Sequence, residues 1–131
     1  MVRVIMHGCN GRMGQVITEM IAKEAEMEIV AGVDVSDSVH NTYPVFKTLK
    51  DCDVEADVVI DFANAKAVDG LLDVCVERNL PCVLCTTGLS EEQLAHVKEA
   101  SGKVAILRSA NMSMGINLLM KLLKDAVPVL A

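Results

Sequence analysis

The sequence predicts an α/β fold, a single-domain doubly wound parallel sheet with helices on both faces. Short apolar runs typical of buried strands alternate along the chain with segments whose apolar residues recur at helical spacing. The connections between them are short, which favours parallel strands joined by right-handed crossovers. The chain has 131 residues, 52% of them hydrophobic but only 2% aromatic, which suits one layered domain with an aliphatic core.

The first strand, turn and helix carry the clearest local signal. An apolar run at 2–6 leads into Gly8, Gly11 and Gly14, and a helix is expected over 11–25. We expect Gly8 to turn the chain sharply, Gly11 to leave room for a phosphate, and Gly14 to let the helix pack against the strand. Backbone N–H groups at the start of such a helix can bind an anionic diphosphate. The turn is therefore a candidate dinucleotide site of the Rossmann type.

Asp34 supports this interpretation. It lies 20 residues after Gly14, at the end of a second strand expected over 28–33, where a carboxylate can accept hydrogen bonds from an adenosine ribose. The spacing is Gly-x-x-Gly-x-x-Gly rather than Gly-x-Gly-x-x-Gly, so a turn that binds nothing remains the alternative. A nucleoside triphosphatase loop is excluded because no Gly-Lys-Ser or Gly-Lys-Thr follows the first glycine.

The remaining elements are expected from periodicity and capping signals. In the first helix the apolar stripe comprises Met13, Val16, Ile17, Met20 and Ile21. Asn64 is expected to cap the second helix, which ends near 78–79, and Ser90 to open the third with a capping box. The other expected elements are a short strand at 45–46 inside a variable segment 36–53, strands at 58–62, 81–85 and 104–107, and an apolar helix over 116–127.

Loops at the carboxyl ends of parallel strands are where ligands gather, so Thr86, Thr87 and Gly88 are placed to meet a cofactor or, alternatively, to form a plain polar turn. Asp61 closes the strand before them. We interpret it as a residue that holds a loop rather than as a general acid.

The five cysteines are expected to be reduced, because their number is odd and the chain does not look like a short secreted one. Cys82 and Cys85 have the spacing of redox or zinc pairs, but strand alternation sends residues three apart to opposite faces. Zinc would need further ligands, and the three histidines show no ligand-pair spacing. No metal site is predicted, although His7, beside the glycine turn, is placed to approach a cofactor.

Charge and hydropathy limit the partners. The net charge of −6 argues against nucleic acid and anionic membranes, which need clustered lysine and arginine. No apolar stretch reaches the roughly 18 to 20 residues that span a bilayer, and the N-terminus is strand-like rather than a signal sequence. We therefore expect a soluble, cytoplasmic protein.

Four segments taken together resemble one known family. They are Gly8-x-x-Gly11-Arg12-Met13-Gly14, 60–62, 86–88 and 109–117, and they are similar, in order over essentially the whole chain, to dihydrodipicolinate (4-hydroxy-tetrahydrodipicolinate) reductases. The resemblance implies hydride transfer from NADH or NADPH to a cyclic imine dicarboxylate in lysine and diaminopimelate biosynthesis. It also implies these cofactor contacts: Gly8, Cys9, Asn10, Gly11, Arg12, Met13, Asp34, Cys85, Thr86, Thr87, Ser109, Ala110, Asn111 and Met112. The family often has glycine in place of Cys85, so a thiol there is expected to narrow the nicotinamide pocket.

The family continues into a second domain with a histidine pair, a nearby lysine and a Ser-Gly-Thr loop, none of which occurs here. We therefore expect residues 1–131 to be the dinucleotide-binding domain alone, without the substrate and oligomerisation domain. On this interpretation the chain has no catalytic residue of its own, is inactive in isolation, and meets the small-molecule substrate only together with the missing domain. The helix at 116–127 has a wide apolar face, for which self-association is a hypothesis.

The sequence leaves open the coenzyme preference and the class of protein. Arg12 is a hypothetical contact for a 2′-phosphate, whereas Asp34 repels one, so both coenzymes are expected to bind, with NADH at least as good as NADPH. The alternatives to the reductase are a noncatalytic nucleotide- or redox-sensing Rossmann module and the coenzyme half of another NAD-linked dehydrogenase.

Overall fold

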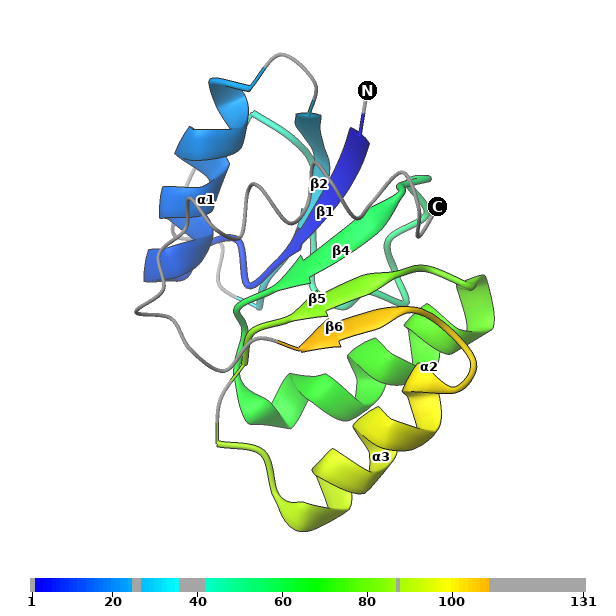
Figure 1. Cartoon of the computed structure of the whole chain (residues 1–131). Helices are drawn as coiled ribbons and strands as arrows, with labels where there is room; N and C mark the ends of the chain where they lie inside the picture. Colours follow the sequence, from blue (N-terminus) through cyan, green and yellow to red (C-terminus); the bar gives the residue numbers. More distant parts are fainter. Residues whose placement is uncertain (1, 25–26, 36–41, 87, 109–131) are drawn as a thin grey trace.

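The computed structural model describes residues 2–24, 27–35, 42–86 and 88–108. Within these residues a six-stranded, wholly parallel sheet has the order β3-β2-β1-β4-β5-β6 (Figure 1). The strands are β1 (Val2–His7), β2 (Met27–Val33), β3 (Val45–Phe46), β4 (Val58–Asp61), β5 (Cys82–Leu84) and β6 (Ile106–Arg108). The helices are α1 (Arg12–Ala22), the 3-10 turn η1 (Ala65–Ala67), α2 (Val68–Arg78) and α3 (Glu91–Ser101).

Helices cover both faces of the sheet, as the doubly wound prediction requires. Helix α1 lies on one face, whereas α2 and α3 lie on the other (Figure 1). In β1, Val4 and Met6 pack with Ile17 of α1, while Ile5 between them packs with Leu71 of α2. This alternation produces two separate apolar cores. The predicted fold class is therefore confirmed.

The structure corrects the predicted face of α1. The helix ends at Ala22 rather than near residue 25, and its buried residues are Gly14, Ile17 and Ile21. Val16 is 37% exposed, although the expected stripe included it. The reason is that Gly14, which has no side chain to hold the helix away, is the point of closest approach to the β1–α1 turn.

Two other expectations change in detail. Asn64 does precede a helical segment, but that segment is η1, and the Asn64 side chain makes no capping hydrogen bond. The last strand is β6 at Ile106–Arg108 rather than 104–107. The expected helix at 116–127 lies outside the described residues.

The cysteines behave as predicted. All five are free and buried. Cys82 packs in the core beneath α2 and α3, whereas Cys85 packs in the core beneath α1, so their sulfur atoms are on opposite sides of the sheet. The pair therefore has the spacing of a C-x-x-C motif without its geometry.

Candidate functional site

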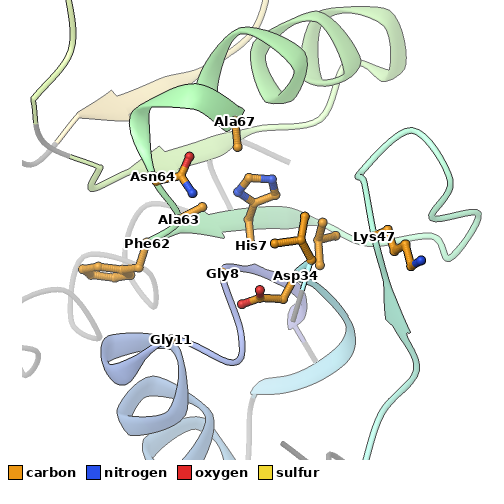
Figure 2. A pocket seen from close by; sticks show the side chains of 11 residues that line it. His7, Gly8, Gly11, Asp34, Lys47, Phe62, Ala63, Asn64 and Ala67 are labelled. Carbon is orange, nitrogen blue, oxygen red and sulfur yellow. The ribbon is translucent and has the colours of Figure 1, made fainter. Parts of the chain in front are cut away.

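A cavity of about 220 Å³ lies at the carboxyl edge of the sheet. Segments that follow β1, β2 and β4 meet there, where the strand order reverses on either side of β1, which is the usual ligand position in open parallel sheets. Figure 2 shows residues from these separate segments around the cavity. Its lining comprises His7, Gly8, Gly11, Val33, Asp34, Val35, Lys47, Phe62, Ala63, Asn64 and Ala67.

The glycine turn has the geometry that the sequence predicted. Gly8 has φ +85°, and a Cβ there would lie 2.8 Å from the backbone nitrogen of Ala63. Left-handed backbone and lack of space both require glycine at this position. A Cβ on Gly14 would lie 2.2 Å from the carbonyl oxygen of Gly8, so α1 packs directly against the turn that ends β1.

Helix α1 begins beside the cavity without a side-chain cap. Its N-cap residue is Gly11, which is exposed and forms no side-chain capping bond, and the first turn contains no acidic residue. The bond from the Gln15 N–H to the Gly11 carbonyl, 3.0 Å long, is the first i→i−4 bond of the helix. The N–H groups of the preceding residues have no partner within the helix and give this end a partial positive charge. An anionic diphosphate can therefore be bound here.

Asp34 stands at the same end of the sheet. Its Oδ2 accepts a hydrogen bond from the Asn10 N–H at 3.0 Å, and its own N–H donates to the Phe46 carbonyl at 2.9 Å. The carboxylate is half-buried and lines the cavity. These bonds fix Asp34 between the glycine turn and β3, with its carboxylate in the cavity wall where a ribose hydroxyl could donate to it.

A buried polar cluster centred on Asp61 holds the strand ends next to the cavity. Asp61, which is fully buried, accepts hydrogen bonds from Nδ1 of His7 at 2.7 Å, from the Ala63 N–H at 3.1 Å and from the Thr86 hydroxyl. Because a carboxylate only accepts, all three partners donate to it. Asp61 thus ties together the ends of β1, β4 and β5, which confirms its predicted role in holding a loop.

Some of the expected contacts turn away from the cavity. Cys9 is fully buried, and its sulfur fills the space next to Gly32. Burial raises the pKa of the Cys9 thiol to about 11, so only the backbone of this residue remains suited to a ligand. Arg12 is exposed and Met13 half-buried at the start of α1, and neither lines the cavity.

The strand-end loop also differs from expectation. Cys85 and Thr86 are both buried and do not line the cavity. The Thr86 hydroxyl, expected to meet a cofactor, instead donates to Asp61, and the Cys85 thiol lies in the core rather than in a pocket. The cause is the parallel pairing of β4 with β5, which places Asp61 opposite Leu84 and so brings both strand ends together. Thr87, Ser109, Ala110, Asn111 and Met112 lie outside the described residues.

Several lining residues were missed by sequence reasoning. Lys47 follows the two-residue strand β3, and Phe62, Ala63 and Asn64 follow β4. The strand order could have found the second group, because the rule that ligands bind where the order reverses selects the ends of β1 and β4. No motif in the sequence around Lys47 indicates that this residue lines a site.

Two kinds of site are not found in the part of the chain that the structure describes. Its histidine, cysteine and acidic side chains form no group of three or more that could hold a metal ion. No helix in the same residues has the length and apolar character needed to cross a membrane.

The family follows from comparison with known sequences. A sequence profile described as "Dihydrodipicolinate reductase, N-terminus" matches residues 2–112. The chain belongs to this family. It is 48% identical over 130 residues to the 4-hydroxy-tetrahydrodipicolinate reductase of Caldanaerobacter subterraneus subsp. tengcongensis, and 46% identical over 125 residues to that of Clostridium tetani. These alignments cover 99% and 95% of this chain but 51% and 49% of the relatives. The chain therefore spans about half the length of the reductases that it matches.

Solved structures agree with this assignment to the dihydrodipicolinate reductase family. A dipicolinate-bound dihydrodipicolinate reductase from Paenisporosarcina sp. TG-14 superposes with a TM-score of 0.76 at 27% identity, over 96% of this chain and 53% of that one. A scyllo-inositol dehydrogenase from Lactobacillus casei, solved with NAD(H) and scyllo-inositol, has a TM-score of 0.71 over 95% of this chain and 41% of its own. At 13% identity the second likeness shows the fold alone.

Proposed function

We propose that this chain is the nucleotide-binding half of a 4-hydroxy-tetrahydrodipicolinate reductase, and that it holds NADH or NADPH for hydride transfer to a cyclic imine dicarboxylate in lysine and diaminopimelate biosynthesis. The observation that carries the proposal is the cavity where the uncapped start of α1 meets Asp34. In this proposal the diphosphate binds at the helix end and the ribose at the carboxylate, where Gly11 and Asp34 both line the cavity.

In this proposal the coenzyme supplies the hydride, and the chain supplies position. N–H groups of the first turn of α1 bind the diphosphate, while Gly8 and Gly11 let it approach the backbone. Asp34 orients the adenosine ribose. Asp61 donates no proton to a substrate here, because its oxygens already accept three hydrogen bonds that hold the strand ends. We assign no catalytic acid to the described residues.

The remaining family contacts stay predictions for the nicotinamide end of the coenzyme. They are Cys85 and Thr86 through their backbone, together with Thr87, Ser109, Ala110, Asn111 and Met112. The imine substrate and the group that protonates it are assigned to the part of the reductases that this chain does not span. Self-association through 116–127 and a cytoplasmic location likewise remain predictions from the sequence.

The redox-sensing alternative is disfavoured by the thiols. Desolvation raises the pKa of Cys85 to about 12, and the hydrogen bond with Cys75, followed by burial, raises that of Cys82 well above its usual value. Reactive cysteines are accessible thiolates, and these residues are neither accessible nor acidic.

Calorimetric titration of the purified chain with NADH and NADPH tests the proposed function. We expect both to bind, with NADH at least as tight as NADPH, and we expect Asp34→Ala to weaken NADH about tenfold, roughly 1.4 kcal/mol, and NADPH less. The matched control is Asp53→Ala, which removes an exposed carboxylate outside the cavity. Circular dichroism establishes that each variant is folded. A folded chain that binds neither coenzyme refutes the proposal, and equal losses for both coenzymes refute the ribose assignment.

A further inference from the structure

Asp34 has a basic neighbour in the sheet, Lys47, which is not close to it in the sequence. In the pairing of β2 with β3, Gly32 lies opposite Val45 and Val33 opposite Phe46. The bond from the Asp34 N–H to the Phe46 carbonyl, 2.9 Å long, continues this ladder by one step, so the next opposed residues are Asp34 and Lys47. Paired residues of adjacent strands are about 4.8 Å apart. Asp34 and Lys47 therefore occupy adjacent backbone positions where the ribose is expected, and the Lys47 side chain extends away from the Asp34 carboxylate (Figure 2).

Lys47 also lies where two cavities meet. A second cavity of about 480 Å³ adjoins the first, and both are lined by His7, Val35, Lys47 and Ala67. Figure 2 shows Lys47 at the edge of the first cavity, and two further lysines, Lys50 and Lys66, line the second. Asp34, the expected ribose contact, lines the first of these cavities, so Lys47 and Asp34 belong to the same cavity wall.

The Lys47 ammonium is available to a ligand. The residue is exposed, and no carboxylate within the described ranges lies at ion-pair distance from it. A lysine side chain is a mobile point charge on a flexible stem and is a common phosphate ligand. It can reach into either cavity without first breaking an interaction.

We propose that Lys47 receives the 2′-phosphate of NADPH, and that this contact lets the chain accept NADPH despite the like charge of Asp34. This inference rests on the proposed function. A 2′-phosphate beside Asp34 is repelled by the carboxylate, and a cation at the adjacent register position offsets that repulsion. Lys50 and Lys66 line the neighbouring cavity as well, together with the acidic residues Asp73 and Glu77, so Lys47 is the lysine that the two cavities share.

The assignment replaces the hypothesis that Arg12 binds this phosphate. Arg12 is the first residue of α1, at the end of the site expected to hold the diphosphate, and it lines neither cavity. Lys47 lines both. The two assignments therefore predict that different substitutions, at Arg12 or at Lys47, weaken the binding of NADPH relative to NADH.

The test is calorimetry with NADPH and NADH, and with 2′,5′-ADP and 5′-AMP as the corresponding adenosine halves. We expect Lys47→Ala to raise the Kd for NADPH and 2′,5′-ADP at least tenfold and to change those for NADH and 5′-AMP less than twofold. Lys47→Arg should retain most of the NADPH affinity. Lys98→Ala, which removes an exposed lysine of α3 outside both cavities, should change neither coenzyme.

The possible failures are distinguishable. A wild-type chain that is folded but does not bind NADH defeats the proposed function and the Lys47 assignment with it. A chain that binds NADH, but in which Lys47→Ala weakens both coenzymes equally or neither, defeats the Lys47 assignment alone. A selective loss of NADPH in Arg12→Ala, with none in Lys47→Ala, returns the phosphate contact to Arg12.

Discussion

At the level of single residues, the glycines show how closely backbone segments approach beneath the site. Gly14 is the tightest case, because a Cβ there would meet the Gly8 carbonyl oxygen at 2.2 Å and the Cys9 Cα at 2.8 Å. Both atoms belong to backbone and cannot move aside as a flexible side chain would. Any side chain at this position must therefore push α1 away from the turn.

We predict that Gly14→Ala destabilises the chain by about 1–3 kcal/mol or more, the usual cost of overpacking. Gly70→Ala is the matched control. Gly70 lies inside α2 with nothing within 4 Å of its added Cβ, so alanine there should stabilise by about 0.5–1 kcal/mol through helix propensity. Urea unfolding of both variants measures the difference. Similar effects in the two variants would show that the Gly8–Gly14 contact is not close.

Residue types were easier to predict than side-chain directions. The requirement for glycine at Gly8 follows from the turn, and the structure confirms it with φ +85°. The inward direction of Thr86 could not be predicted, because its hydroxyl meets Asp61 only through the pairing of β4 with β5. The local sequence around Thr86 does not indicate which strand β5 pairs with.

At the level of elements, a charged contact joins α2 to α3. His96 of α3 lies with Nδ1 2.7 Å from Oδ1 of Asp69 and with Nε2 3.0 Å from Oδ1 of Asp73, both on α2. Gln93, the residue that completes the capping box with Ser90, also donates to Asp69. The hydrogen bond with Asp69 raises the pKa of His96 and lowers that of Asp69.

We predict that this contact stabilises the fold most between roughly pH 4 and pH 6.5. The His96 pKa is raised above 6.5, so its contribution is complete below that value and is lost as pH rises through the folded-state pKa. The Asp69 pKa is lowered below 3.8, so its contribution is present above that value and is lost as pH falls through the folded-state pKa. Urea midpoints of wild type and His96→Gln should therefore differ most near pH 5.5 and converge near pH 8. A difference that is constant with pH would contradict this.

The elements themselves were largely predictable, because each has a local cause. The capping box at Ser90 is present as expected, with Ser90 N–H donating to the Gln93 side chain at 3.0 Å and Gln93 N–H donating to the Ser90 hydroxyl at 3.1 Å. The irregularity in β2 was not predictable. Val4 pairs with Ile29 but Ile5 pairs with Ala31, which shifts the register by one residue. Such a shift depends on the neighbouring strand rather than on the periodicity of β2.

At the level of the whole molecule, the site exists only because distant segments share one edge of the sheet. Asp34, Lys47 and Ala63 come from three connections and meet through the strand order. The sequence predicted that the site lies at the carboxyl edge of the sheet, since parallel strands place their carboxyl ends together. It did not predict that β3 pairs with β2. The candidate site was therefore predicted at the turn and at Asp34 and missed at Lys47.

A ligand that contacts all three connections should stabilise the whole sheet. Binding to the native state alone adds RT ln(1 + [L]/Kd), which is about 2.7 kcal/mol when the coenzyme is at 100 times its Kd. We expect NADH at that excess to raise the Tm of the wild-type chain by several degrees. Asp34→Ala at the same NADH concentration should show a smaller rise, because its higher Kd lowers [L]/Kd. Adenine, which lacks ribose and diphosphate, is the negative control. If adenine raises the Tm as much as NADH does, the stabilisation comes from the base alone, and neither Asp34 nor the start of α1 contributes to binding.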